Sequence, residues 1–289
     1  MERQISVRIT FKYVLIIEWL DTHDNKTGEL LHQYLQKMGL RSVLVRCNSP
    51  DDLKVALGMA YIRVPAWGYP VIHIESHGDE PETGTGVDSG FGLSAVNGLS
   101  WKDLGRLLAP LNRACSFELL VVGATCYGLG AISAMNIYDH EAPFAATIGF
   151  TTAVVPGSLH DSMKELYRSL QANSDPWEAV RNAQRELRSE HEEIKLTTSI
   201  HIAFMIIDSA YDLVRSEHAM NETVARIKNR ADSLEISFTK AFEESLPELL
   251  VQQTQARSRE AWNRWFPLDL QMRNEHYRWD DLLADFRAS

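Results

Sequence analysis

Short apolar runs alternate with amphipathic helical patterns through the first two thirds of this 289-residue chain. The runs have the length of single buried strands, and the segments between them place apolar residues at helical spacing. Alternating strands and helices are typical of βαβ units, which build a mostly parallel sheet covered by helices on both faces. This alternation constrains the fold more than any other feature of the sequence.

Six apolar runs are predicted to be the strands of one sheet. They are Val14–Leu20, Ser42–Arg46, Pro70–Glu75, Phe117–Gly123, Ala145–Thr152 and His201–Asp208. The helices predicted between them are Thr27–Met38, Pro50–Tyr61, Trp101–Leu111, Leu129–Tyr138, Leu159–Gln171 and Pro176–Glu190. We therefore predict an α/β fold with a mostly parallel six-stranded sheet, helices on both faces and a helical C-terminal extension.

The pattern divides the chain into a domain at 1–208 and an extension at 209–289. From residue 209 the sequence is charged and helix-forming, and Asn221–Ser258 predicts one or two amphipathic helices with a break near Pro247. The aromatic residues that follow must pack on something, because so many cannot stay solvated. Within the domain, Asp79–Leu99 is rich in glycine and Ser189–Ser199 is charged, and both are predicted to be irregular loops.

The composition indicates a soluble protein of a reducing compartment. A net charge of −10 argues against nucleic acid or an anionic membrane as the main partner. The early apolar run Tyr13–Leu20 is shorter than the roughly 20 residues that a membrane-spanning helix needs. Three cysteines (Cys47, Cys115 and Cys126) do not form a disulfide framework. We expect a cytoplasmic protein with no membrane and no direct nucleic-acid partner.

The chemistry-bearing residues stand where two of the predicted strands end. Ser-His-Gly ends one strand at Gly78, and Ala-Thr-Cys-Tyr-Gly ends another at Gly128. Because the carboxyl ends of parallel strands meet at one edge of a sheet, His77 and Cys126 can be brought together there. An imidazole can activate a cysteine thiol as a nucleophile. The N–H groups of Gly78 and Cys126 can donate to a developing oxyanion.

Other interpretations of these residues were weighed. A lone cysteine or histidine at a strand end is more often structural than catalytic. His73 and His77 are four residues apart on a strand, about 13 Å, which is too far to share one metal ion. A phosphate-binding loop with its lysine and a Gly-x-Ser-x-Gly nucleophile motif are both absent from the sequence. We expect no metal and no cofactor.

Two segments resemble caspase-like cysteine peptidases of clan CD. VIHIESHGDE at Val71–Glu80 is similar to their histidine segment, and FELLVVGATCYG at Phe117–Gly128 is similar to their cysteine segment. His77 precedes Cys126 by 49 positions, and caspases place the histidine about 50 residues upstream of the cysteine. Further on, Leu166–Leu170 and Ala179–Leu187 resemble stretches of the CHAT domains, a caspase-like branch common in bacteria. The resemblance covers roughly residues 10–208.

The resemblance implies a caspase-like fold and a cysteine endopeptidase with a His77–Cys126 dyad. It also implies substrate contacts from residues around the dyad: Asp79, Ala124, Thr125, Thr151 and Thr152. Two features depart from the family. Ala124 stands where relatives carry Gln, Glu or Asp, and Thr151–Gly157 lacks the acid found there in CHAT and separase-like members. The binding site for the residue before the cleaved bond (P1) is then small or apolar, or draws its charge from Glu75, Asp79 or Asp88.

By resemblance, the physiology expected is that of a regulated protease in bacterial antiviral defence or cell death. Its partners would be a protein substrate and an activator or effector that docks on the C-terminal helices. Those helices could equally do no more than cover apolar surface. The alternative for the whole chain is a catalytically inactive caspase-like scaffold that binds a partner through its C-terminal helices.

Overall fold

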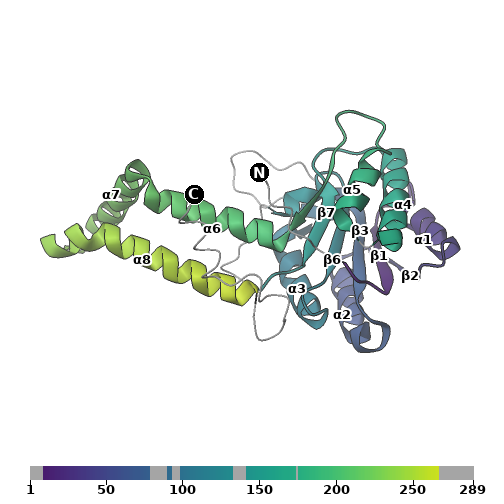
Figure 1. The fold of residues 1–289 in the computed structure, drawn as a ribbon, viewed down its shortest axis with the longest axis horizontal. Helices are drawn as coiled ribbons and strands as arrows, with labels where there is room; N and C mark the ends of the chain where they lie inside the picture. The colour runs from purple at the N-terminus through teal and green to yellow at the C-terminus, as the bar shows by residue number, and fades with distance from the viewer. Residues whose placement is uncertain (1–8, 79–89, 93–97, 133–140, 174, 267–289) are drawn as a thin grey trace. The chain divides into compact units, whose positions relative to one another are not determined.

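The computed structural model describes residues 9–78, 90–92, 98–132, 141–173 and 175–266 (Figure 1). The chain divides into two compact units. The first, here the α/β unit, comprises Met1–Asn136 and Ala142–Ser199, and the second, the helical unit, comprises Ile137–Glu141 and Ile200–Ser289. The boundary predicted after residue 208 lies inside a helix, and the two units divide nine residues earlier, between Ser199 and Ile200.

The α/β unit is built on the predicted mostly parallel sheet. Its strands run in the order β2 (Ser42–Arg46), β1 (Tyr13–Trp19), β3 (Pro70–Gly78), β6 (Leu120–Ala124), β7 (Ala146–Phe150) and β8 (Ile194–Thr198). The first five are parallel to their neighbours, and β8 is antiparallel to β7. The short strands β4 (Gly90–Gly92) and β5 (Leu99–Ser100) extend the end of β3 by antiparallel pairing. The α/β class and the six-stranded mostly parallel sheet are confirmed.

Helices cover both faces of the sheet (Figure 1). On one face lie α1 (Thr27–Lys37), α4 (Pro156–Asn173) and α5 (Pro176–Gln184), and on the other lie α2 (Pro50–Trp67) and α3 (Trp101–Ala114). Local sequence sets where several of them begin. The side chains of Ser49, Ser100 and Asp175 accept hydrogen bonds from backbone N–H groups in the first turns of α2, α3 and α5, which satisfies donors that a helix start leaves unpaired.

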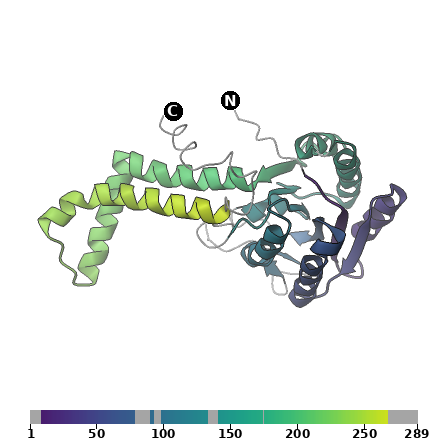
Figure 2. The same cartoon turned by 60° about the horizontal axis from the view of Figure 1, so that its bottom comes forward.

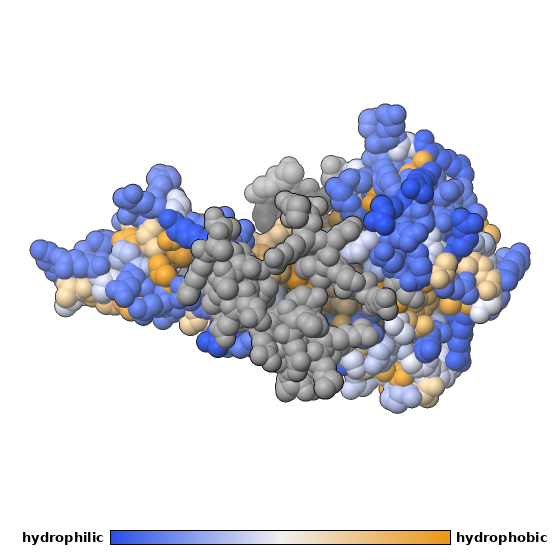
Figure 3. All heavy atoms as spheres, viewed as in Figure 1, coloured by the Kyte–Doolittle hydropathy of each residue, from blue (hydrophilic) through white to orange (hydrophobic). Residues whose placement is uncertain are grey.

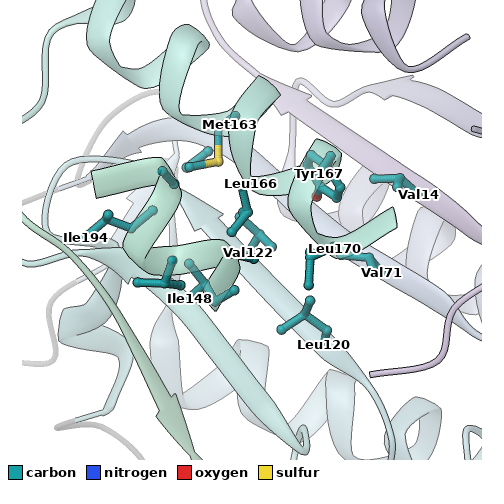
Figure 4. Close-up of a cluster of buried hydrophobic side chains, with 14 of the residues drawn as sticks. Val14, Val71, Leu120, Val122, Ile148, Met163, Leu166, Tyr167, Leu170 and Ile194 are labelled. Atoms are coloured by element: carbon teal, nitrogen blue, oxygen red, sulfur yellow. The ribbon is translucent and has the colours of Figure 1, made fainter. Parts of the chain in front are cut away.

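The core that fixes the sheet lies under α4 (Figure 4). Strand side chains such as Val71, Val122 and Ile148 pack against Leu166 and Leu170 of that helix, and all five are buried. Each fully buried aliphatic side chain stabilises the fold by about 1.5–3 kcal/mol. The strand ends, and the residues that follow them, are therefore held on a rigid support.

The predicted strand at His201–Asp208 is wrong. These residues belong to α6 (Ser199–Arg215), and the sixth strand is Ile194–Thr198, inside the segment predicted to be an exposed loop. A short continuous apolar run fits a buried strand and a helix equally well. The strand at Ile194–Thr198 has the alternating pattern of a strand, because Ile194, Leu196 and Thr198 are buried while Lys195 between them is exposed.

Two predicted segments are only partly described. Where a helix was expected at Leu129–Tyr138, the structure has a 3₁₀ helix, η1, at Gly128–Ile132, and residues 133–140 lie outside the described part of the chain. Most of Asp79–Leu99 also lies outside it, apart from β4 and the start of β5.

The helical unit contains α6, α7 (Glu217–Ser233) and α8 (Lys240–Trp265). Helices α6 and α8 lie side by side in both views (Figures 1 and 2), with the rings of Phe204 and Trp262 5.4 Å apart. The break predicted near Pro247 is wrong, because α8 continues through that proline. The chain instead turns between Leu234 and Thr239.

Large apolar side chains remain exposed on the helical unit, and orange spheres are visible among the blue ones over its helices (Figure 3). They are Met205, Leu213, Leu234, Ile236, Phe242 and Leu249. Among the helices that the structure describes, none has both the length and the apolar character needed to span a membrane.

Candidate functional site

The structure brings His77 and Cys126 to neighbouring strand ends. Strands β3 and β6 pair in parallel with Glu75 beside Ala124. His77 lies two residues after Glu75 near the end of β3, and Cys126 lies two residues after Ala124, in the turn that follows β6. The juxtaposition predicted from the two strand-end motifs is therefore present at the carboxyl edge of the sheet, where α/β folds place their ligands.

Gly78 brings the two strand ends into direct main-chain contact. A Cβ atom built on Gly78 would overlap the carbonyl oxygen of Cys126 and would lie 3.0 Å from the Thr125 hydroxyl. Since real Cβ atoms do not approach so closely, the spacing between the strand ends requires glycine here. The N–H groups proposed as oxyanion donors, those of Gly78 and Cys126, thus belong to two segments that touch.

The chain turns back sharply after Cys126. Tyr127 adopts a left-handed conformation with φ of 54°, which costs a non-glycine residue roughly 1–2 kcal/mol. Two hydrogen bonds hold the turn, from the Tyr127 N–H to the Thr152 carbonyl at 3.1 Å and from the Gly128 N–H to the Thr125 carbonyl at 3.1 Å. The thiol of Cys126 is half-buried and lies 3.9 Å from the carbonyl oxygen of Val154.

The other two cysteines are chemically different from Cys126. Both are buried within the α/β unit. Burial, with a smaller contribution from Asp52, raises the pKa of the Cys47 thiol to about 11. Burial, with a smaller contribution from Glu118, raises the pKa of the Cys115 thiol to about 12. Both thiols therefore stay protonated and unreactive at neutral pH.

The imidazole of His77 has a carboxylate partner that the sequence analysis did not identify. Its side chain is 58% exposed, and its Nε2 atom lies 2.9 Å from Oδ2 of Asp24, in the loop between β1 and α1. Burial alone would raise the pKa of Asp24, but hydrogen bonds from His77 and from the Asp21 N–H together hold it below its ordinary value. Among the described residues, no hydrogen bond joins the ring directly to the Cys126 sulfur.

A buried polar chain lies on the same face of β3, just before His77. His73 lies 3.0 Å from the Tyr167 hydroxyl through Nδ1 and 3.0 Å from the Glu75 carboxylate through Nε2. The other oxygen of Glu75 accepts a hydrogen bond from the hydroxyl of Thr27, at the start of α1. Glu75 is only 1% exposed, so it is not available as the pocket charge that the sequence suggested.

The predicted substrate-contact residues divide into three groups. Ala124 and Thr125 are each 1% exposed, so their side chains face the interior. Thr151 and Thr152, after β7, are half-buried and lie beside the Cys126 turn. Asp79, like Asp88, lies outside the described residues.

Glu193, the residue just before β8, contacts both threonines. The Thr151 hydroxyl donates to Oε2 of Glu193 at 2.8 Å, and the Glu193 N–H donates to the Thr152 hydroxyl at 3.3 Å. Glu193 also pairs with Lys195 at 2.9 Å. These bonds to Lys195 and Thr151 lower the pKa of Glu193, which is therefore ionised at neutral pH. This acid lies about 40 residues beyond Thr151–Gly157, so the sequence near the fifth predicted strand gives no sign of it.

The neighbouring acid, Glu192, has a structural role. It is buried, and its carboxylate accepts hydrogen bonds from the N–H groups of Val155, Arg188 and Ser189 at 2.9, 3.2 and 3.3 Å. Val155 follows the residue whose carbonyl contacts the Cys126 thiol. Glu192 therefore fastens the loop that forms one wall beside the cysteine.

The sequence matches no known protein family, and a search of curated proteins found no relative.

Proposed function

We propose that the chain is a caspase-like cysteine endopeptidase, similar to the CHAT-domain branch, and that His77 and Cys126 are its catalytic dyad. The observation that carries the proposal is the contact between the two strand ends, where Gly78, the residue after His77, approaches the main chain of Cys126. A thiol and an imidazole on adjacent strand ends are the groups that nucleophilic attack on a peptide carbonyl requires.

In the proposed reaction, His77 accepts the proton of the Cys126 thiol, and the thiolate attacks the carbonyl carbon of the scissile bond. The negative charge on the carbonyl oxygen is stabilised by the N–H groups of Gly78 and Cys126. His77 then gives its proton to the departing amine, which leaves a thioester on Cys126. Water hydrolyses the thioester with His77 acting as the base, and the free thiol is restored.

Glu193 suggests the class of side chain that precedes the cleaved bond. Its ionised carboxylate lies on Thr151 and is paired with Lys195, a cation that a basic P1 side chain would replace. The carboxylate that relatives carry in the segment after the fifth strand is, in this proposal, supplied from the residue just before β8 instead. The expected substrate is a partner protein cleaved after Lys or Arg.

The alternative is an inactive caspase-like scaffold that acts in the cytoplasm through its helical unit. Two observations favour it: the Cys126 sulfur contacts a backbone carbonyl rather than the imidazole, and large apolar side chains are exposed on α6–α8. The first is also compatible with catalysis, because hydrogen bonds between catalytic groups are often long before substrate binds.

Thiol reactivity and peptide cleavage together test the proposal. Wild-type protein and Cys126→Ala are compared for iodoacetamide uptake at pH 6–8 and for cleavage of a peptide library with varied P1. Cys47 and Cys115 contribute little labelling, since burial keeps their thiols protonated. The proposal predicts fast labelling and cleavage that both vanish in Cys126→Ala. Labelling of Cys126 no faster than a free thiol, with no cleavage, would establish the scaffold instead.

A further inference from the structure

The contact between His77 and Asp24 determines which ring nitrogen carries a proton. Oδ2 of Asp24 lies 2.9 Å from Nε2 of His77, and the pKa of Asp24 is lowered, so its carboxylate is ionised at neutral pH. An ionised carboxylate can only accept hydrogen bonds. Nε2 must therefore donate, and Nδ1 is left as the nitrogen that can take a proton from a thiol.

The loop that carries Asp24 is fixed at its own centre. The Asp21 N–H donates to Oδ2 of Asp24 at 2.7 Å, and the Asp24 N–H donates back to the Asp21 carbonyl at 3.1 Å. These reciprocal bonds close a tight turn. The carboxylate is thus aimed by the backbone, and it is only 27% exposed.

Two buried acids fasten the far end of the same loop to the sheet. The Glu29 N–H, in the first turn of α1, donates to Oε1 of Glu18 on β1 at 3.1 Å. Thr27 donates to Glu75, which stands two residues before His77 on β3. The loop and the histidine are consequently tied to the same strand, which keeps the carboxylate and the imidazole in register.

The charge around the imidazole is dominated by carboxylates. The elements that border His77 contribute Asp24, Asp21 and His23 from the β1–α1 loop, Cys126 from the end of β6, and Glu75 from β3 itself. The described residues of β4, which pairs with the end of β3, are Gly-Phe-Gly and carry no charge. Asp24 is the acid among them that forms a hydrogen bond with the imidazole ring.

The geometry points to Asp24 as a positioning residue that completes a Cys126–His77–Asp24 triad by holding the Nε2–H tautomer of His77 and stabilising its imidazolium. This inference rests on the proposed function and adds a third member to its dyad. When Nδ1 takes the thiol proton, both ring nitrogens carry hydrogen, and the positive charge is balanced by the thiolate and by Asp24. A carboxylate in this place orients the histidine without touching the substrate.

The test measures the imidazole and the reaction separately. Asp24→Asn and Asp24→Glu are compared with wild type, and Asp21→Asn is the matched control, because its carboxylate lies on Thr22 rather than His77 and the variant keeps its backbone N–H. Nitrogen-detected NMR of labelled histidine reports the tautomer and pKa of His77, with Cys126→Ala assigning the effect of the thiolate. Peptide cleavage across pH 5–9 gives kcat and KM.

We expect Asp24→Asn to weaken the preference of His77 for the Nε2–H tautomer, because an amide can donate as well as accept a hydrogen bond. We expect kcat to fall about 100-fold, in the range of general acid–base contributions, with KM little changed. Asp24→Glu should restore part of the activity, and Asp21→Asn should behave as wild type.

Each result separates this inference from the proposed function. If wild type cleaves and Asp24→Asn has the same His77 pKa, the same tautomer and the same kcat, the inference is overturned while the protease proposal stands. If wild type does not cleave, the proposed function fails, and the positioning role fails with it even where NMR shows the ion pair. A loss of activity in Asp24→Asn without any change in the His77 resonances would also overturn the inference, because it would indicate a merely structural role.

Discussion

Different interactions stabilise the carboxyl edge of the sheet and the helical unit. At the edge, buried or half-buried carboxylates grip the loops by hydrogen bonds: Asp24 holds His77, Glu75 holds Thr27 and Glu192 holds Val155. In the helical unit, aromatic rings pack together: the ring of Trp262 lies 5.4 Å from that of Phe204 and 4.6 Å from that of Phe266, tilted to both. Hydrogen bonds are directional, so they fix the orientation of the side chains and loops at the edge. Aromatic packing is not, so it keeps the helices of the helical unit in contact without orienting particular groups.

The largest effect is expected from breaking the aromatic packing. Trp262→Ala removes a side chain that is fully buried in the helical unit, and such truncations cost about 3–5 kcal/mol. Urea unfolding followed by circular dichroism measures the loss. Phe242→Ala, on an exposed position of α8, is the control and should cost far less. Iodoacetamide labelling of Cys126 should be unchanged in both variants, and coupled loss of labelling would contradict the contrast drawn above.

Glu192→Gln tests how far the hydrogen bonds of a buried carboxylate stabilise the carboxyl edge. Burial raises the pKa of Glu192. The hydrogen bonds that its carboxylate accepts from Val155, Ser158 and the Arg188 and Ser189 N–H groups outweigh burial, so the pKa lies below the ordinary 4.5. The folded-state pKa is depressed, so the stabilisation is fully present above pH 4.5 and is lost as pH falls through the folded value. Since hydrogen bonds to charged groups contribute about 1.5–3 kcal/mol, the variant should lose that much at pH 7.

The measurement for Glu192 is the free energy of unfolding between pH 3 and pH 7. Wild type should lose stability with acid more steeply than Glu192→Gln, so the two curves should converge at low pH. Glu190→Gln, on an exposed neighbour, should follow the wild-type curve. Parallel curves for wild type and Glu192→Gln would show that the charge of the carboxylate contributes nothing to the free energy of unfolding.

Glu193→Gln tests whether a carboxylate of the carboxyl edge also sets the specificity of the proposed cleavage. Loss of its charge beside Thr151 should lower kcat/KM for peptides with Lys or Arg before the cleaved bond by about ten-fold, which corresponds to roughly 1.4 kcal/mol of ion pairing. Peptides with an uncharged residue there should be cut equally well by both proteins. An equal loss for both peptide classes would assign Glu193 to the fold rather than to specificity.

The smallest effect is expected from the polar chain behind the edge. Tyr167→Phe removes the hydroxyl that pairs with Nδ1 of buried His73. A single hydrogen bond of this kind contributes about 0.5–1.5 kcal/mol, and thermal unfolding can resolve that change. Tyr34→Phe, whose ring only packs at the border of the core, should leave the midpoint of unfolding where it is.

The sequence was sufficient for the layout of the α/β unit. Apolar runs such as Leu120–Ala124 are buried on both faces, so their composition alone indicates parallel strands. The strand-end positions of His77 and Cys126 followed from the same runs. The sequence-based prediction was wrong at His201–Asp208, where the continuous apolar run is a helix. It also missed the strand Ile194–Thr198, which is short and follows a run of charged residues.

The third residue of the site could not be found by scanning motifs. Asp24 lies 53 positions before His77 and stands among other polar residues of an ordinary loop, so only the parallel pairing of β1 with β3 brings them together. Glu193 reaches Thr151 for a similar reason, because β8 runs antiparallel to β7. A sequence predicts which residues end a strand, but their partners depend on the order of strands in the sheet.

Gly78 sets a limit on how this site can vary. Its main chain touches that of Cys126 so closely that a methyl group would have nowhere to go. A library that admits all amino acids at position 78 should therefore return glycine alone among variants that retain a reactive Cys126. Under the proposed mechanism, a larger side chain at position 78 would push Cys126 away from His77 and so separate the two reacting groups.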